Sequence, residues 1–375
     1  MDRAIVALLF LLWHVPTALA GQTGLTLAVE PKPVLTIGEA LGNSPAYSFT
    51  DIASIIVVGD SIFVLEGAAN EIRIFAHDGK LLGRIGREGE GPGEFMWPTA
   101  MRLVADEIAV VDLRLRRQSF FSLGGDLIRT EPLGRLGDQA LAGSAEMQRG
   151  IVVAETAVTI SSEGGAFPER LLVLAYPETQ RVDTIARYST GYVPYRTPDS
   201  YGFLETRAGS EGDWAVAGDS LLAVVSGEPS ELRWWRSGEQ GLRLAGELVL
   251  PVSPESFTRG DARELIDKTN EGRRAEGTDL LPRSVQLDAP RYWGQIKQLV
   301  ISDQEECWIQ WDRPRSDEDE EWFRVNLKNR GLERAVLPPG FRMLAAVGGN
   351  LYGFVLTDYD VPVMTVLRLR QRRSR

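Results

Sequence analysis

Histidine and cysteine, the residues most often used for metal binding and nucleophilic catalysis, are scarce in this chain. There are two histidines and one cysteine. His14 lies in an apolar N-terminal stretch, and His77 stands beside Asp78 in a predicted hairpin turn, where a solvated side chain is expected. Histidine-ligated zinc sites and Ser-His-Asp triads both require histidines close to other chemical groups. The sequence therefore excludes both kinds of site.

The single cysteine, Cys307, has no partner for a disulfide within the chain. It lies in a strand-like apolar run, Cys307–Trp311, which favours a buried small apolar residue. A reactive thiol is the alternative.

An enzyme built on this chain would have to use carboxylates. Asp51, Glu205 and Asp213 lie near the starts of predicted inner strands, but those strands read as mostly apolar, and the three acids do not form a converging set. The acidic run 317–321 lies between two aromatic-bearing strands. A calcium loop would need glycine and alternating ligands, so a solvated hairpin tip is expected there.

A glycine-rich run at 86–93 raises the question of a phosphate-binding loop. Such a loop needs a helix that begins just after the glycines, so that the N-terminal amides face the anion. Here Phe95, Trp97 and Pro98 follow, and then another predicted strand. The run is therefore interpreted as a connector that needs glycine at positive φ.

Large aromatic side chains gather in the predicted connectors. The candidate binding residues are Phe49, Phe95, Trp97, Tyr292, Trp293 and Phe341. They would line the mouth of a channel as flat surfaces for a ligand. The alternative is that they pack as wedges between neighbouring sheets.

A repeated four-strand unit must position these residues. The unit is clearest in residues 59–95, where two strands, an Asp-Gly hairpin turn, an outer strand and a connector follow one another. Similar units start near residues 60, 106, 150, 219, 303 and 349. Periods of about 40–50 residues built from four short strands predict an all-β, six-bladed β-propeller of four-stranded blades.

The last unit has only three strands, and the N-terminal region supplies a strand without a unit. Val34–Gly38 aligns with an outer strand and its connector, so we expect it to complete the last blade and close the ring. Two segments interrupt the repeat. Tyr188–Gly209 is expected to be an irregular loop over one face, and 253–277 a short helical insertion that begins at Asp261.

One stretch of sequence resembles a known family. Gly86–Phe95, following Asp78–Leu82, is similar to the signature of bacterial six-bladed β-propellers related to NHL-repeat proteins. The resemblance supports the fold and is nearly silent on activity, because the family contains both binding modules and enzymes. Its lyases bind metal through histidines that this chain lacks. Its lactone-hydrolysing relatives use Glu, Asp and Asn with Ca²⁺ at the channel end of the inner strands.

The composition and net charge of the chain limit the kinds of partner that it can bind. The chain has 375 residues and a net charge of -11, so an acidic surface argues against nucleic acid and against anionic membranes. Residues 4–13 form a short apolar run, followed by Pro16 and a small-residue site at 18–20, which predicts a secretory signal at 1–20. An uncleaved anchor is the alternative.

The sequence thus predicts a periplasmic or secreted protein, with a propeller over 21–370 and a basic tail at 371–375. We expect a monomer with no membrane span after signal cleavage. The expected function is non-catalytic binding of a protein, peptide or carbohydrate at the channel face, without a cofactor. The alternative is a carboxylate- or Ca²⁺-dependent hydrolase of small esters or lactones.

Overall fold

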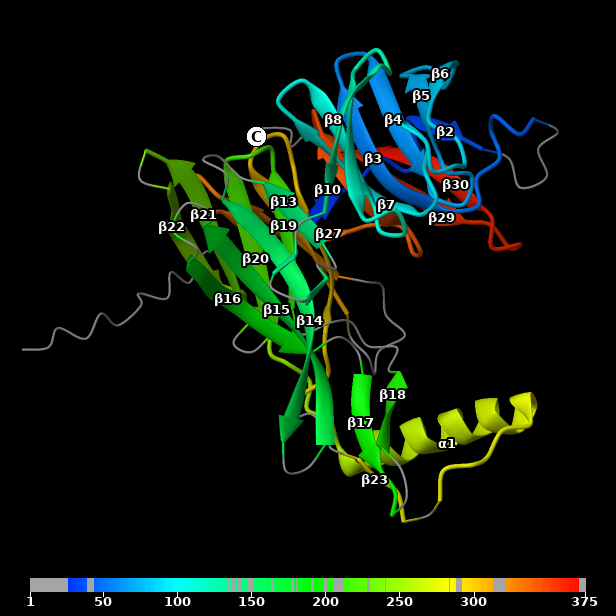
Figure 1. The fold of residues 1–375 in the computed structure, drawn as a ribbon, viewed down its shortest axis with the longest axis vertical. Helices are drawn as coiled ribbons and strands as arrows, with labels where there is room; N and C mark the ends of the chain where they lie inside the picture. Colours follow the sequence, from blue (N-terminus) through cyan, green and yellow to red (C-terminus); the bar gives the residue numbers. More distant parts are fainter. Residues whose placement is uncertain are drawn as a thin grey trace, which may run out of the picture.

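The computed structural model describes residues 26–38, 44–133, 135–136, 139–140, 143–146, 151–162, 165–176, 179, 181–189, 192–198, 201–205, 212–227, 230–239, 241–282, 284–287, 292–312 and 321–370. Over these residues the chain forms six blades arranged as a ring, together with one helix and two small sheets (Figure 1). The predicted signal, the acids at 317–320 and the tail at 371–375 lie outside the described residues.

The first three blades follow the chain in order. Blade 1 contains β3 (Ile52–Val58), β4 (Ser61–Glu66), β5 (Glu71–Ala76) and β6 (Leu81–Ile85). Blade 2 contains β7 (Pro98–Val104), β8 (Glu107–Asp112), β9 (Arg117–Ser122) and β10 (Leu127–Pro132). Blade 3 contains β13 (Gly143–Glu146), β14 (Val152–Ser162), β15 (Gly165–Tyr176) and β16 (Arg181–Ser189). A small hairpin, β11 (Arg135–Leu136) and β12 (Gln139–Ala140), lies between blades 2 and 3 in sequence.

The other three blades complete the ring. Blade 4 contains β19 (Gly212–Ala217), β20 (Leu221–Gly227), β21 (Ser230–Gly238) and β22 (Gly241–Val249). Blade 5 contains β24 (Ile296–Ile301), β25 (Glu306–Trp311), β26 (Glu321–Asn326) and β27 (Leu332–Val336), and β1 (Thr26–Ala28) is added at its outer edge. Blade 6 contains β28 (Arg342–Val347), β29 (Asn350–Leu356), β30 (Pro362–Arg368) and β2 (Leu35–Ile37). The six-bladed propeller predicted from the repeats is confirmed.

Alternation within single strands builds the core between blades. In β4, Ile62 and Val64 belong to the hydrophobic cluster shared with blade 6, whereas Phe63 and Leu65 belong to the cluster shared with blade 2. All four are at most 2% exposed. Because successive strand side chains point to opposite faces, an unbroken apolar run can serve both neighbouring blades.

The N-terminal strand closes the ring as predicted. β2 pairs antiparallel with β30, with Ile37 opposite Met364, and Ile37 is 2% exposed in the cluster between blades 6 and 1. A second contact was not predicted. β1 pairs in parallel with β27, and Leu27 is buried between blades 5 and 6. The segment from β1 to β2 therefore joins the outer edges of both blades.

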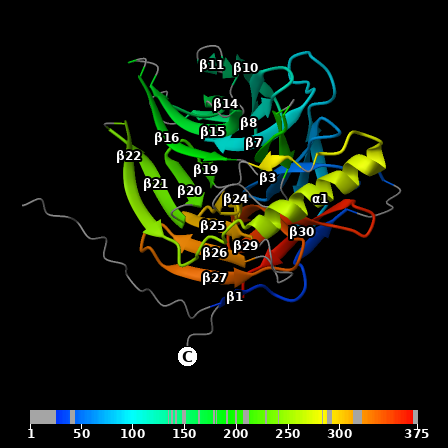
Figure 2. The same ribbon diagram turned by 90° about the horizontal axis from the view of Figure 1, so that it is seen from below.

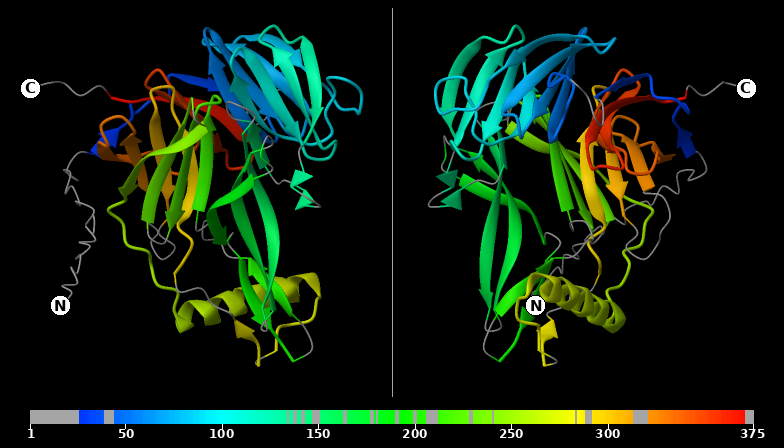
Figure 3. Two further views of the ribbon diagram at one scale, coloured as in Figure 1. Left: turned by 60° about the vertical axis from the view of Figure 1, so that its left-hand side comes forward. Right: turned by 90° about the vertical axis from the view of Figure 1, so that its right-hand side faces the viewer.

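Two long connectors form a separate layer at one end of the ring, which we call the connector layer. It contains β17 (Tyr192–Arg196), β18 (Tyr201–Glu205), α1 (Arg259–Glu276) and β23 (Gln286–Leu287). β17 pairs with both β18 and β23, so the layer joins the connector before blade 4 to the connector before blade 5. Figures 1 and 3 show α1 and the small sheet together beyond one end of the blades, and Figure 2 shows α1 lying across that end.

The layer corrects two sequence predictions. Tyr188–Gly209 is not an irregular loop, because it contains β17 and β18. The helical insertion is present, but its N-cap is Thr258, whose side chain accepts a hydrogen bond from the Asp261 amide. Asp261 is therefore the third helical position of a capping box and not the cap.

The closing strand gives a direct stability prediction. Replacing Ile37 with Ala removes a buried side chain from the cluster between blades 6 and 1 and should lower the free energy of unfolding by about 2–4 kcal/mol. Val34→Ala is the matched control, because Val34 is 44% exposed and should change that free energy by less than about 0.5 kcal/mol. Urea unfolding measures both. Equal effects would show that closure does not depend on buried packing of β2.

Candidate functional site

The sequence-predicted aromatic residues do not form one surface. Phe49, Phe95 and Phe341 are 3%, 1% and 0% exposed and lie in three different clusters between blades. They are packing wedges, which corrects their assignment as ligand-contacting residues. The local sequence is built around this packing: Gly86 has φ 80°, and a Cβ there would lie 2.2 Å from the Phe95 ring.

The other three aromatic residues lie at or near the surface. Trp97 is 58% exposed at the connector end of the ring, just before β7. Tyr292 and Trp293 are partly buried just before β24. The Trp293 ring packs against Phe257, with 4.5 Å between ring centroids, and its indole nitrogen is buried without a hydrogen-bond partner. Of the six candidates, Trp97 is the one most available to a ligand.

Buried carboxylates hold the connectors in place. Asp112, at the end of β8, is 1% exposed and accepts hydrogen bonds from the amides of Met96, Trp97 and Leu115. Glu66, at the end of β4, accepts from the amides of Thr50 and Asp51 in the same way. The two acids occupy equivalent repeat positions. Because their oxygens are used by backbone donors, we interpret them as structural groups.

Another buried acid, Glu155 on β14, gathers groups from three other strands. It is 6% exposed and accepts hydrogen bonds from the Tyr188 hydroxyl at 2.8 Å and from the Trp214 indole nitrogen at 2.7 Å. The Arg170 guanidinium forms an ion pair with it. Tyr188 lies near the end of β16 and Trp214 near the start of β19, so Glu155 joins the two ends of the segment that carries β17 and β18.

Asp213 lies beside this cluster and is partly buried. Its carboxylate accepts hydrogen bonds from the Trp214 amide at 2.8 Å and from the Leu299 amide of β24 at 2.6 Å. Burial, with a smaller contribution from the Glu155 charge, raises the pKa of Asp213 from 3.8 to about 7. Burial and the same charge raise the pKa of Tyr188, so its phenol stays protonated. Asp213 could therefore donate or accept a proton near neutral pH.

Sequence reasoning identified Asp213 but missed the groups around it. Asp51 is exposed, and the side chain of Glu205 lies outside the described part of the structure. Glu155, Arg170 and Tyr188 were missed. The available signal was Glu155 itself, an acid within the apolar run of β14, because a buried acid requires partners.

The remaining reactive residues have structural explanations. Cys307 is fully buried, and burial raises the pKa of its thiol, which confirms the expected apolar environment. His77 is exposed in its turn, with its ring nitrogen 3.0 Å from the Gly59 carbonyl oxygen. Within the described residues, no group of three or more His, Cys, Asp or Glu side chains could hold a metal ion. No helix in the described part of the chain is long and apolar enough to cross a membrane.

Comparisons with known proteins agree with the fold. Residues 45–139 match the model of a family, DUF5128, described as a 6-bladed beta-propeller. The chain is similar to a Bacteroides fragilis protein named as exported, with a TM-score of 0.51 and 10% identity over 92% of this chain and 99% of the other. No curated protein sequence matches.

Two further solved structures are more distant. A duf4221 family member from Bacteroides vulgatus has a TM-score of 0.46 and 12% identity over 94% and 100% of the two chains. Virginiamycin B lyase from Staphylococcus aureus has a TM-score of 0.38 and 12% identity over 86% and 98%. With TM-scores under 0.5, these two structures carry no argument about this chain, and at 10% identity the Bacteroides fragilis structure supports the fold alone. The chain is a six-bladed β-propeller, and its relation to NHL-repeat proteins stays a prediction.

Asp213 predicts an unusual pH dependence of stability. Its folded-state pKa lies above its ordinary value, so the folded protein holds a proton that the unfolded chain releases. This contribution is fully present below about pH 4 and is lost as the pH rises to about 7. Asp213→Asn cannot ionise and still offers an oxygen to the Leu299 amide.

The measurement is the unfolding midpoint of both proteins across this pH range. The stability of Asp213→Asn relative to the unmodified protein should increase from about pH 4 to about pH 7 and then stay constant. Taking the difference between the two proteins cancels the effect of the other carboxylates. A difference that does not change with pH would show that Asp213 ionises freely, and a change in the opposite direction would show that folding lowers its pKa; either result would contradict the prediction.

Proposed function

We propose that this protein is an exported, non-catalytic binding propeller that takes a protein, peptide or carbohydrate ligand at the connector end of the ring. The export part rests on the N-terminal sequence, with its short apolar run at 4–13 and small residues at 18–20.

The observation that carries the proposal is the connector layer. The layer has its own small core, in which Tyr195, Leu204 and Leu281 are buried and Leu265 and Ile266 of α1 pack against them. It adds no strand to any blade, and none of the residues of α1 is buried. A segment that the ring does not need for closure, packed on its own small core beside the mouth of the ring, is typical of a binding surface on a propeller scaffold.

The carboxylates near the connectors favour binding over catalysis. Glu66 and Asp112 hold backbone amides, and removing them would release the connectors. Their oxygens are therefore committed to structure. The exposed indole of Trp97 lies beside one of these fixed connectors, where it provides a preorganised flat surface for a peptide or sugar.

Trp97 gives the test of the binding proposal. The mature chain, residues 21–375, is screened against a peptide display library and a glycan array, and the affinity of the best probe is measured by titration calorimetry. Trp97→Ala should weaken that affinity at least about tenfold, as expected for a central aromatic contact. Leu82→Ala is the control, because Leu82 is similarly exposed on the outer strand β6 and should leave the affinity unchanged. Equal effects of the two variants would contradict binding at the connector end.

A second function is favoured by one observation. Asp213, Glu155 and Tyr188 bring together two acids and a protonated phenol, and Asp213 can carry its proton near pH 7. This is the chemistry that a carboxylate-dependent hydrolase of small esters or lactones would use.

The hydrolase is tested with p-nitrophenyl acetate and γ-butyrolactone, each with Ca²⁺ and with EDTA. If the protein is a binding module, no turnover above the uncatalysed rate is expected. Turnover that Asp213→Asn lowers by at least about 100-fold would replace the binding proposal with the hydrolase, because general acid–base groups contribute effects of that size.

A further inference from the structure

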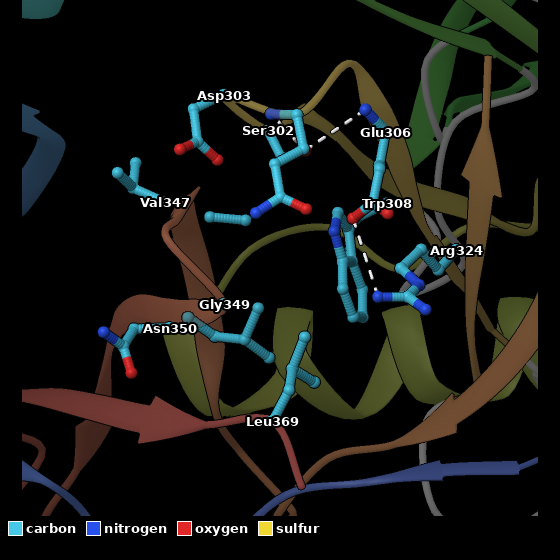
Figure 4. A pocket seen from close by; sticks show the side chains of 12 residues that line it. Ser302, Asp303, Glu306, Trp308, Arg324, Val347, Gly349, Asn350 and Leu369 are labelled. Atoms are coloured by element: carbon cyan, nitrogen blue, oxygen red, sulfur yellow. Dashed lines mark hydrogen bonds and ion pairs between the residues drawn. The ribbon is translucent and has the colours of Figure 1, made fainter. Parts of the chain in front are cut away.

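A polar hollow lies between blades 5 and 6 at the end of the ring opposite the connector layer. Its rim is formed by the turn between β24 and β25 and by the turn between β28 and β29. Its volume is about 30 Å³, enough for a group the size of a water molecule or a hydroxyl, and it is open to solvent on one side. Figure 4 shows Trp308, Glu306 and Arg324 on one side of it, and Asp303, Gly349 and Asn350 on the other.

Trp308 presents a hydrogen-bond donor that has no partner. Its side chain is 0% exposed, and its indole nitrogen is buried without a hydrogen bond. In Figure 4 this nitrogen lies on the edge of the ring that faces the Asp303 and Gly349 side of the hollow. A buried donor without an acceptor is costly, by about 1–3 kcal/mol, so an acceptor is expected to fill this position.

The side chains next to Trp308 determine which other hydrogen bonds this acceptor can form. The Ser302 hydroxyl already accepts from the amides of Gln304 and Glu306, so it has its proton left to donate. The Glu306 carboxylate is buried and lies 3.7 Å from Arg324, whose closer partner is Glu333 at 2.9 Å. The Glu306 carboxylate also has a side-chain hydrogen bond with Asn326. Because a carboxylate offers about four acceptor positions, Glu306 has room to accept one more hydrogen bond.

Charge excludes one class of ligand. Among the charged groups in and beside the hollow, three acids, Asp303, Glu306 and Glu333, outnumber two guanidiniums, those of Arg324 and of Arg368, whose Nε lies 3.4 Å from the Asn350 side-chain oxygen. A carboxylate or phosphate would be repelled. A backbone carbonyl would satisfy the indole but give nothing to Glu306. A hydroxyl fits both requirements, because it has two acceptor positions and one proton to donate.

We propose that this hollow binds a hydroxyl group of a neutral carbohydrate, accepting from Trp308 and Ser302 and donating to Glu306. The exposed carboxylate of Asp303 and the amides of Gln304 and Asn350 at the rim are placed to meet the neighbouring hydroxyls of the same sugar. This site lies at the other end of the ring from the proposed connector-end surface and does not depend on it.

The test follows the indole N–H signal of Trp308 by nuclear magnetic resonance. The chain has nine tryptophans, few enough for their indole signals to be resolved singly, and the signal missing from Trp308→Phe identifies the one in the hollow. D-glucose, D-xylose and N-acetyl-D-glucosamine are added at millimolar concentrations. At least one should shift the Trp308 signal in a saturable way.

Variants separate this site from a general effect. Gln304→Ala, at an exposed rim position that leaves the core unchanged, should weaken the affinity read from the Trp308 signal by about fivefold, as expected for one hydrogen bond. Trp308→Phe should weaken sugar binding by a similar factor in calorimetry. Leu82→Ala, at an exposed position on the outer strand β6 of blade 1, should leave it unchanged.

Two results would overturn the proposal. If none of the sugars moves the Trp308 signal, the hollow holds ordered water only. If a sugar binds but Gln304→Ala and Trp308→Phe leave its affinity unchanged, the sugar lies elsewhere on the chain.

Discussion

The antiparallel pairing of β2 with β30 is the constraint on which the ring depends. It brings residues 35–37 beside residues 364–366 and covers the outer edge of blade 6. The entropy lost on closing a loop grows only slowly with the length of the loop. Closing a loop that contains nearly the whole chain therefore costs little more entropy than closing a shorter one. The lone Cys307 cannot crosslink the ring. The β1–β27 pairing and the burial of Leu27 add a second non-covalent contact between the N-terminal segment and the ring, beside the β2–β30 pairing.

In a closed ring, the connector end and the opposite end can serve different functions. At the connector end, Glu66 and Asp112 fix the backbone that leads into β3 and β7, and Glu155 fixes both ends of the segment that carries β17 and β18. At the opposite end, short turns leave a polar hollow between blades 5 and 6. The same architecture, rigid strands with variable connections, supports both proposals because the strands do not have to move.

Repetition made most of the fold predictable, and its absence explains what was missed. The four-strand units that recur about every 40–50 residues and the unmatched strand at Val34–Gly38 predicted the blades and their closure. β1 has three residues and no repeat partner, so its parallel pairing left no signal. Phe49 and Trp97 could not be separated by residue type, because burial depends on which neighbouring blade covers each ring. The Glu155 cluster joins strands far apart in sequence, which no local pattern reports.

Native-state hydrogen exchange of β2 and β30 tests the central structural claim most directly. If closure by the N-terminal strand holds the ring together, the amides of Ile37 and Met364, which lie opposite each other across the β2–β30 pair, should exchange as slowly as those in the centre of blade 1, because both would open only in global unfolding. Rapid exchange at these two amides, with slow exchange in blade 1, would contradict the account. The ring would then be held by interblade packing alone, with β2 as a loosely attached edge.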